Sequence, residues 1–252
     1  MTPKTFSGAV KRAVLASLLC GAVSLFAHYT WLSPAPPTAK AGDTVTVLLA
    51  GGHSFPEAEA PVQGVALTMT VFDPSGKPVA LTPEDKGRGP EASFKAEAEG
   101  LYLVAGEFDR GVISRTPDGW KPGGKSEHPN AVSSMKSYSS FLCAVRTSGT
   151  APTSAAPRGL AFEVTWKREG RRLTALVTAG NKPVEGAEIS VIIGSGDSKP
   201  MGKSDAQGKA GIDIPEGFKG SILLIGSLSK PAPAGSDYDL ERKSSSHFLT
   251  WE

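Results

Sequence analysis

Short apolar and β-branched runs alternate with turns rich in Gly, Pro, Asp and Asn along most of the chain. In residues 65–72, Val65, Leu67, Met69 and Val71 occupy every second position, the period of a strand with one buried face. Comparable patterns predict further strands at residues 44–49, 77–81, 92–96, 100–108, 139–145, 162–167, 171–178, 188–193, 210–214, 220–227 and 247–251. Almost no segment has a helical period. The pattern predicts an all-β fold of the sandwich type.

The predicted strands 92–96 and 100–108 are expected to form a hairpin. Two stretches then interrupt the strands. Residues 110–137 are rich in Pro and Gly and are expected to form a long loop that is functional or mobile. Residues 148–158 are rich in Thr, Ser, Ala and Pro, which indicates a linker. We therefore predict a signal peptide at 1–27, an N-terminal metal-binding β-sandwich at 28–147, the linker at 148–158 and a C-terminal Ig-like β-sandwich at 159–252.

The first residues have the pattern of a cleaved export signal. Lys4, Lys11 and Arg12 precede an apolar stretch at 13–26 that is too short to span a membrane comfortably. Cleavage after Ala27 would make His28 the mature N-terminus. A terminal His offers its α-amine and imidazole Nδ1 together, a pair that can chelate a late transition metal. Cleavage after residue 22 is the alternative, and His28 would then be an ordinary residue of the first strand.

Composition narrows the class of protein. The chain has 252 residues and a formal net charge of +2, too small to indicate a nucleic-acid partner. Outside the signal, no apolar run is long enough to cross a bilayer, so we expect a soluble mature protein without stable membrane insertion, periplasmic or secreted. Cys20 lies in the signal and Cys143 is then the single mature cysteine, which excludes an intramolecular disulfide. The apolar run around Cys143 indicates a buried thiol.

Three further histidines are candidates for chemistry. His53 follows a predicted strand and two glycines, and the nearby Glu57 and Glu59 can ligate a metal or orient an imidazole. His247 shares a strand face with apolar residues, so it is either a ligand or a buried, hydrogen-bonded side chain. His128 lies in the predicted loop and is most simply a surface residue. The chain has no common zinc motif, nucleophile elbow or phosphate loop.

Several segments resemble a known family. They are Ala27-His28-Tyr29-Thr30-Trp31-Leu32-Ser33-Pro34, Gly52-His53-Ser54-Phe55-Pro56-Glu57, Arg115-Thr116-Pro117-Asp118-Gly119-Trp120, Lys136-Ser137-Tyr138-Ser139-Ser140-Phe141 and the terminal His247 strand. In order and spacing the chain resembles the DUF4198 family of exported proteins, whose members are associated with nickel or cobalt uptake. The resemblance implies a periplasmic metal-binding accessory protein of a membrane transporter, with His28, His53 and His247 as metal ligands.

The second half resembles Ig-like or transthyretin-like modules. The residues that carry this likeness are 182–191, Lys-Pro-Val-Glu-Gly-Ala-Glu-Ile-Ser-Val, and 204–210, Ser-Asp-Ala-Gln-Gly-Lys-Ala. Such modules are usually structural, and a fold alone assigns no activity. The predicted architecture is thus two Ig-like or transthyretin-like β-sandwich domains after a cleaved signal peptide.

These observations leave more than one function open. The first hypothesis is a non-enzymatic protein that binds Ni²⁺, with Co²⁺ or Cu²⁺ as alternatives, through His28, His53 and His247 or a carboxylate. Binding needs neutral imidazoles, so affinity should fall as the pH drops through about 6.5. The alternatives are a structural or adhesion module without a metal site and a copper-binding protein. A copper oxidative enzyme that cleaves polysaccharides also uses a terminal His, but only 7% of the residues here are aromatic.

Overall fold

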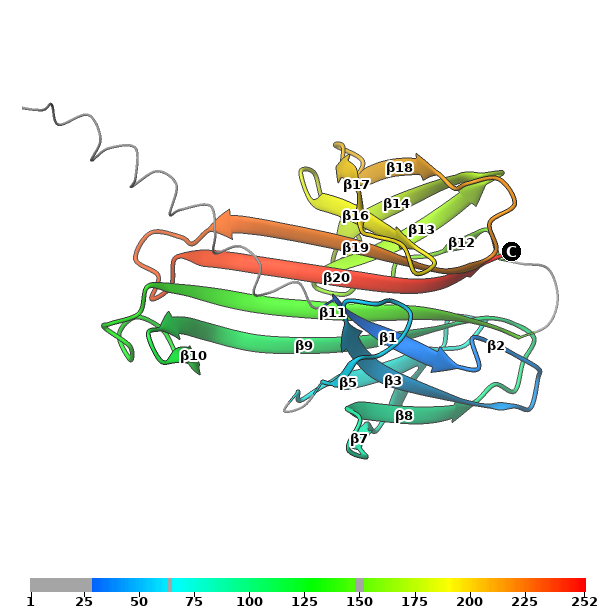
Figure 1. The fold of residues 1–252 in the computed structure, drawn as a ribbon, viewed down its shortest axis with the longest axis horizontal. Helices are drawn as coiled ribbons and strands as arrows, with labels where there is room; N and C mark the ends of the chain where they lie inside the picture. The colour runs from blue at the N-terminus through cyan, green and yellow to red at the C-terminus, as the bar shows by residue number, and fades with distance from the viewer. Residues whose placement is uncertain (1–28, 63–64, 148–151) are drawn as a thin grey trace, which may run out of the picture.

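The computed structural model of the chain describes residues 29–62, 65–147 and 152–252, and every regular element in these ranges is a β-strand. The strands form three sheets, one of ten strands and two of five (Figure 1). The all-β, sandwich-like fold expected from the sequence is therefore confirmed.

The ten-stranded central sheet has the order β17-β16-β19-β20-β11-β9-β5-β6, with β10 paired to β9 and β2 to β11. Its strands are β2 (Thr38–Ala39), β5 (Thr68–Phe72), β6 (Pro78–Leu81), β9 (Gly100–Thr116), β10 (Gly119–Pro122), β11 (Ser133–Thr147), β16 (Glu188–Ile193), β17 (Lys199–Lys203), β19 (Gly220–Pro231) and β20 (Leu240–Trp251).

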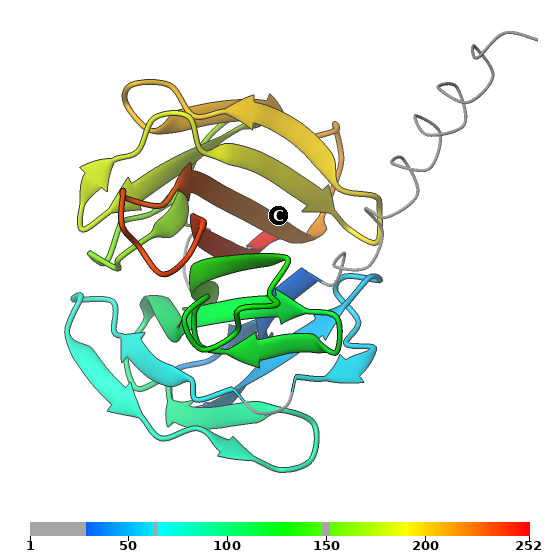
Figure 2. The same ribbon diagram turned by 90° about the vertical axis from the view of Figure 1, so that its left-hand side faces the viewer.

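Two smaller sheets cover it. The N-terminal outer sheet contains β1 (Tyr29–Ala35), β3 (Thr44–Gly52), β4 (Ala60–Pro61), β7 (Glu84–Asp85) and β8 (Pro90–Lys95). The C-terminal outer sheet contains β12 (Ser154–Ala155), β13 (Glu163–Glu169), β14 (Arg172–Ala179), β15 (Lys182–Pro183) and β18 (Lys209–Asp213). Figure 2 shows the resulting pair of sandwiches end on.

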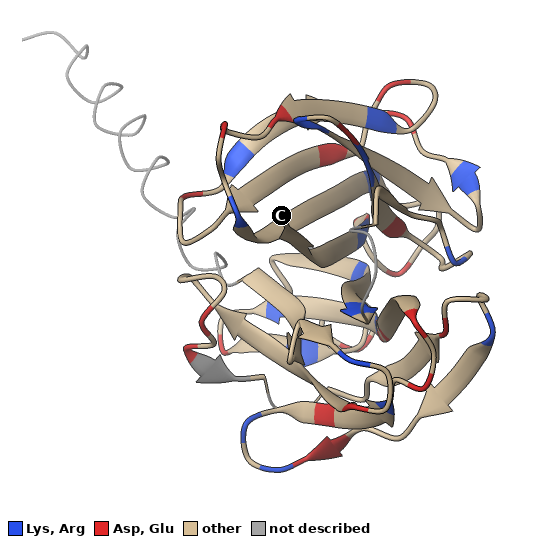
Figure 3. Ribbon diagram, turned by 90° about the vertical axis from the view of Figure 1, so that its right-hand side faces the viewer, with Lys and Arg blue, Asp and Glu red and all other residues tan. Residues whose placement is uncertain are grey.

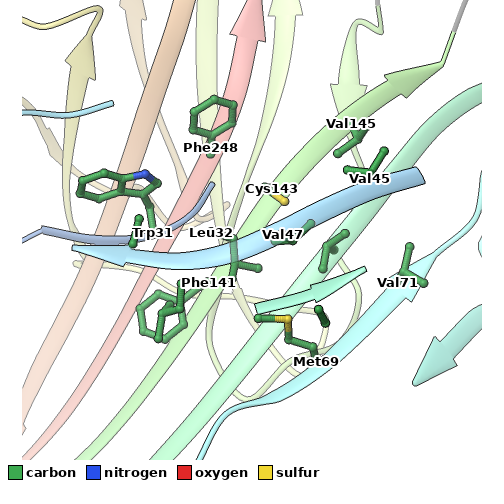
Figure 4. Close-up of a cluster of buried hydrophobic side chains, with 14 of the residues drawn as sticks. Trp31, Leu32, Val45, Val47, Met69, Val71, Phe141, Cys143, Val145 and Phe248 are labelled. Atoms are coloured by element: carbon green, nitrogen blue, oxygen red, sulfur yellow. The ribbon is translucent and has the colours of Figure 1, made fainter. Parts of the chain in front are cut away.

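The two outer sheets pack on opposite faces of the central sheet. Successive side chains of a strand point to opposite faces, so each central strand can contribute apolar residues to both cores. In β11, Phe141, Cys143 and Val145 belong to the core beneath the N-terminal outer sheet (Figure 4). Ala144, between them, belongs to the core beneath the C-terminal outer sheet, as does Leu103 of the neighbouring strand β9. One sheet thus serves both cores.

The central sheet also joins the two halves of the sequence. Strand β11 from the first half runs parallel to β20 from the second, from the pair Met135–Leu240 to the pair Cys143–Phe248. Of the predicted linker 148–158, residues 148–151 lie outside the described residues, and Ser154–Ala155 forms β12, which pairs with β13. The division into domains at 28–147 and 159–252 stays a prediction.

The predicted hairpin between residues 92–96 and 100–108 is wrong. Strand β8 pairs with β3 in the N-terminal outer sheet, whereas β9 pairs with β5 and β11 in the central sheet. At the end of β8, the backbone N–H of Ala96 donates to the Asp43 carbonyl at 2.9 Å, and that of Gly42 donates to the Ala96 carbonyl at 2.7 Å. Alternation shows that both segments are half-buried strands, but it does not identify the neighbour of either.

The long loop predicted at residues 110–137 is also largely wrong. Strand β9 continues to Thr116, turns into β10, and β11 begins at Ser133. These extensions project beyond the outer sheets together with the ends of β19 and β20 (Figure 1), and we call them the arm. Their residues are largely polar because no outer sheet covers them, so the apolar alternation that predicts a strand is missing.

Buried hydroxyl groups link the C-terminal outer sheet to the central sheet. The Val164 N–H of β13 donates to Ser245 Oγ at 3.0 Å, and Ser140 Oγ lies 2.9 Å from Ser245 Oγ and 2.6 Å from the Phe162 carbonyl oxygen. Ser140 and Ser245 are almost fully buried. Water therefore has little access to replace a lost partner.

We expect the substitution Ser245→Ala to lower the free energy of unfolding by about 2 kcal/mol, because it leaves the buried Val164 N–H without an acceptor. Urea denaturation monitored by circular dichroism measures this loss. Ser244→Ala is the matched control on the same strand, since Ser244 is half-buried and bonds Ser139 at the surface of a groove. Equal losses in the two variants would contradict the role of the buried hydroxyl.

Lys and Arg residues are interspersed with Asp and Glu residues along the strands and turns (Figure 3). No helix in the part of the chain that the structure describes is long and apolar enough to span a membrane.

Candidate functional site

The segment after β3, residues 53–62, folds back onto the end of that strand because two glycines leave room for it, and we call it the His53 loop. A Cβ atom on Gly51 would lie 2.8 Å from Val62 Cγ2, and one on Gly52 would lie 3.0 Å from Glu59 Cγ. The backbone N–H of Glu59 donates to the Gly51 carbonyl at 3.1 Å. The loop thereby returns Glu59 to the point where β3 ends and His53 follows.

His53 and Glu59 are neighbours at the surface. The backbone N–H of His53 donates to Glu59 Oε2 at 2.9 Å. The pKa of Glu59 is lowered, first by a hydrogen bond from the Ser54 side chain, then by the bond from the His53 N–H, and also by the charge of His53. A carboxylate that stays ionised next to an imidazole provides two ligand types that divalent transition metals accept.

Phe55 holds this loop in place. Its side chain is 1% exposed, whereas His53 and Ser54 on the same loop are exposed. The Phe55 ring makes edge contacts with Trp31 of β1, at a centroid distance of 5.4 Å, and with Phe248 of β20, at 5.7 Å. Trp31 is fully buried in the core beneath the N-terminal outer sheet. The loop is therefore fixed to both β1 and the central sheet.

The beginning of β1 lies beside the same loop. Tyr29, the first described residue, pairs with Gly52, the residue before His53. His28, the predicted N-terminal ligand, and the predicted signal peptide at 1–27 lie outside the described residues. The described chain thus starts one residue after His28 and next to the His53 loop.

His247 lies in a different environment from His53. Its side chain is fully buried, and its Nδ1–H donates to the Val164 carbonyl at 2.9 Å. It shares its face with Leu249 and packs near Trp166, in the core under the C-terminal outer sheet. The structure therefore does not bring the His247 ring to the His53 loop, which contacts the opposite face of β20 through Phe248.

Burial decides the ionisation of His247. Desolvation lowers its pKa to about 4, against a smaller opposing effect of the hydrogen bond to Val164. Nε2 is buried without a hydrogen-bond partner among the described residues. Burial therefore favours the neutral ring, with its proton on Nδ1.

The other two candidates are apart from this site. His128 lies in the loop at the end of the arm, with Nε2 2.7 Å from the Pro122 carbonyl oxygen. Cys143 is a free, fully buried thiol whose pKa is raised by desolvation, as expected from its apolar sequence context. Among the described residues, no three His, Cys, Asp or Glu side chains form a group that could hold a metal.

A comparison with protein families gives a match over residues 25–218 to the family described as "Domain of unknown function (DUF4198)". The match covers most of the chain, so the protein belongs to this family, and the resemblance noted from its sequence is confirmed. A comparison with curated proteins gives no match. The association with nickel or cobalt stays a prediction.

Proposed function

We propose that the protein is an exported, periplasmic binding protein, not an enzyme, that takes up Ni²⁺ or Co²⁺ and supplies it to a membrane metal transporter. The metal would be cargo, held at the surface where β1 begins and the His53 loop returns. The ligands would be the α-amine and imidazole of a mature N-terminal His28, the imidazole of His53 and the carboxylate of Glu59.

The pairing of Tyr29 with Gly52 is the observation that carries this proposal. In the sequence His28 precedes Tyr29 and His53 follows Gly52, so each histidine is one residue away from this pair. This neighbourhood in sequence supports a metal site that uses both histidines.

The chemistry of the donors supports a late transition metal. Nitrogen donors suit nickel, cobalt, copper and zinc, and one carboxylate is compatible with all of them. The proposed set leaves out His247, because its ring is buried in the other core and its Nδ1–H is engaged by Val164. Intrinsic affinity would favour Cu²⁺ over Ni²⁺, so preference for nickel would come from geometry and metal supply.

Glu59→Gln tests the carboxylate. We expect Ni²⁺ affinity to fall about tenfold, because Glu59 either binds the metal or orients the His53 segment. Isothermal titration calorimetry of the mature, exported protein measures the change. Glu57→Gln is the matched control, since Glu57 is exposed on the same loop and its removal changes the net charge equally. An equal loss in both variants would assign the effect to charge alone and contradict the ligand set.

A structural or adhesion module is the competing function, and it predicts a different titration. Such a module would bind Ni²⁺ no better than a peptide of scrambled sequence with the same histidines. Tighter binding of Cu²⁺ than of Ni²⁺, with the same dependence on His53, would support the copper-binding alternative with this site intact.

A further inference from the structure

A groove of about 250 Å³ lies next to the first residues of β1. It runs along the face of the central sheet that carries the core under the N-terminal outer sheet, since Phe141 belongs to both. Tyr29 and Thr30 line it together with Ser246, whose Oγ donates to the Thr30 carbonyl at 2.8 Å. Neither His53 nor Glu59 lines the groove.

Two arginines line this groove from opposite sides of β11. Arg242 of β20 pairs with Ser137, which in turn pairs with Gly111 of β9. Arg110 precedes Gly111, so the two arginines lie two strand spacings apart, a backbone separation of about 10 Å. Their guanidinium groups can therefore reach a single small molecule lying over β11.

A β-bulge aims Arg110 at the groove. Tyr138 pairs with Asp109 and Ser137 with Gly111, so Arg110 is the extra residue between the two pairs. Gly111 has φ of +66°, which a glycine adopts without strain, and its N–H donates to Asp109 Oδ1 at 2.9 Å. Such bulges commonly redirect a side chain at a binding site.

The arginines are available to a ligand. The Arg110 guanidinium carbon lies 5.2 Å from the centroid of the Phe108 ring, which orients the group without neutralising it. Within the described residues, neither Arg110 nor Arg242 forms an ion pair with an acidic side chain. The described lining of the groove contains no Asp or Glu. Its charge is therefore positive and uncompensated.

Hydroxyl groups form the floor between the arginines. Ser139 of β11 and Ser244 of β20 are 2.9 Å apart through their Oγ atoms and line the groove with Ser227 of β19. Phe108 and Ile225 add apolar surface. Hydroxyls and paired guanidinium groups over a partly apolar floor match carboxylates on a short carbon chain.

We infer that this groove binds a small organic anion that carries two or more carboxylates. The two arginines each take one carboxylate, the serine hydroxyls donate to the remaining oxygens, and the apolar surface contacts the carbon chain. The volume, below the range of about 300–1,000 Å³ of typical ligand pockets, restricts the ligand to a short chain. The inference does not depend on metal binding.

The test uses the full mature protein, freed of metal on an immobilised chelating resin, and propane-1,2,3-tricarboxylate as the probe. We expect saturable binding by isothermal titration calorimetry. Arg110→Gln and Arg242→Gln should each weaken it by about tenfold or more, because each removes a charge-assisted hydrogen bond. Arg115→Gln is the matched control, since Arg115 is an exposed arginine on the same strand outside the groove. Ser139→Leu, which fills the floor, should also weaken binding.

Three results would overturn the inference. The first is no binding of the tricarboxylate at millimolar concentration, and the second is equal affinities in the two groove variants and the control. The third is equally tight, arginine-dependent binding of inorganic phosphate or acetate, which would show a general anion site. Because the probe is tested without metal, failure here leaves the nickel proposal untouched, and the reverse also holds.

Discussion

His53→Ala weakens Ni²⁺ binding by at least about a hundredfold if the proposed site is correct. Loss of groups that merely support a metal ligand costs about 10–100-fold in affinity, and a direct ligand should cost no less. The substitution removes an exposed side chain, while Phe55 continues to hold the loop through Trp31 and Phe248. The fold should therefore survive, and the loss should lie in metal affinity alone.

Calorimetric titration of the mature protein with Ni²⁺ measures this loss, and thermal unfolding without metal checks the fold. His128→Ala is the matched control, because it removes an imidazole from the loop at the end of the arm. We expect the control to keep the affinity of the wild type. Unchanged binding by His53→Ala, or an equal loss in His128→Ala, would exclude His53 as a ligand.

The buried His247 makes the folded state sensitive to acid. Its pKa is about 4 in the folded protein because of desolvation, whereas an unfolded His titrates near 6.5. Between these values the unfolded state binds more protons, so stability falls as the pH falls from about 6.5 to about 4. The corresponding loss for full protonation is roughly 3 kcal/mol.

Urea denaturation of the wild type and of His247→Asn, at about pH 7 and about pH 4, tests this prediction. Asn keeps a donor near the position of Nδ1 but does not titrate. We expect the stability advantage of the wild type to shrink by roughly 3 kcal/mol at the lower pH. Comparing the two proteins cancels contributions from groups such as Glu163, whose pKa is raised by burial. A constant difference between them would show that His247 does not titrate as inferred.

The sequence predicts the half-buried strands well. Leu67, Met69 and Val71 are buried, and the strands predicted at 162–167 and 171–178 correspond to β13 and β14, which pair with each other. In such segments a covered face requires an apolar residue at every second position. The same pattern correctly placed His247 on the face of Leu249 and Trp251.

The sequence pattern did not predict which sheet β8 and β9 belong to, nor the strands of the arm, which no outer sheet covers. Alternation in β8 and β9 shows burial but not that the two belong to different sheets, which depends on contacts distant in sequence. The arm was missed because both of its faces are largely polar and its strands are held by backbone pairing.

The candidate site was predicted in part. His53 and Glu59 were named from their position after a strand and two glycines, and the loop does bring them together. The groove with Arg110 and Arg242 was missed, because its residues come from strands far apart in the chain. The serines at 139–140 and 244–246 in place of apolar residues were the available signal.

The mass of the mature protein exported by its native host, measured intact with and without Ni²⁺ under native conditions, tests the central claim most directly. The proposal predicts a chain that begins at His28 and gains the mass of one Ni²⁺ ion. A chain that begins at Val23 or elsewhere and binds no nickel would contradict it, and would leave the structural module as the better description.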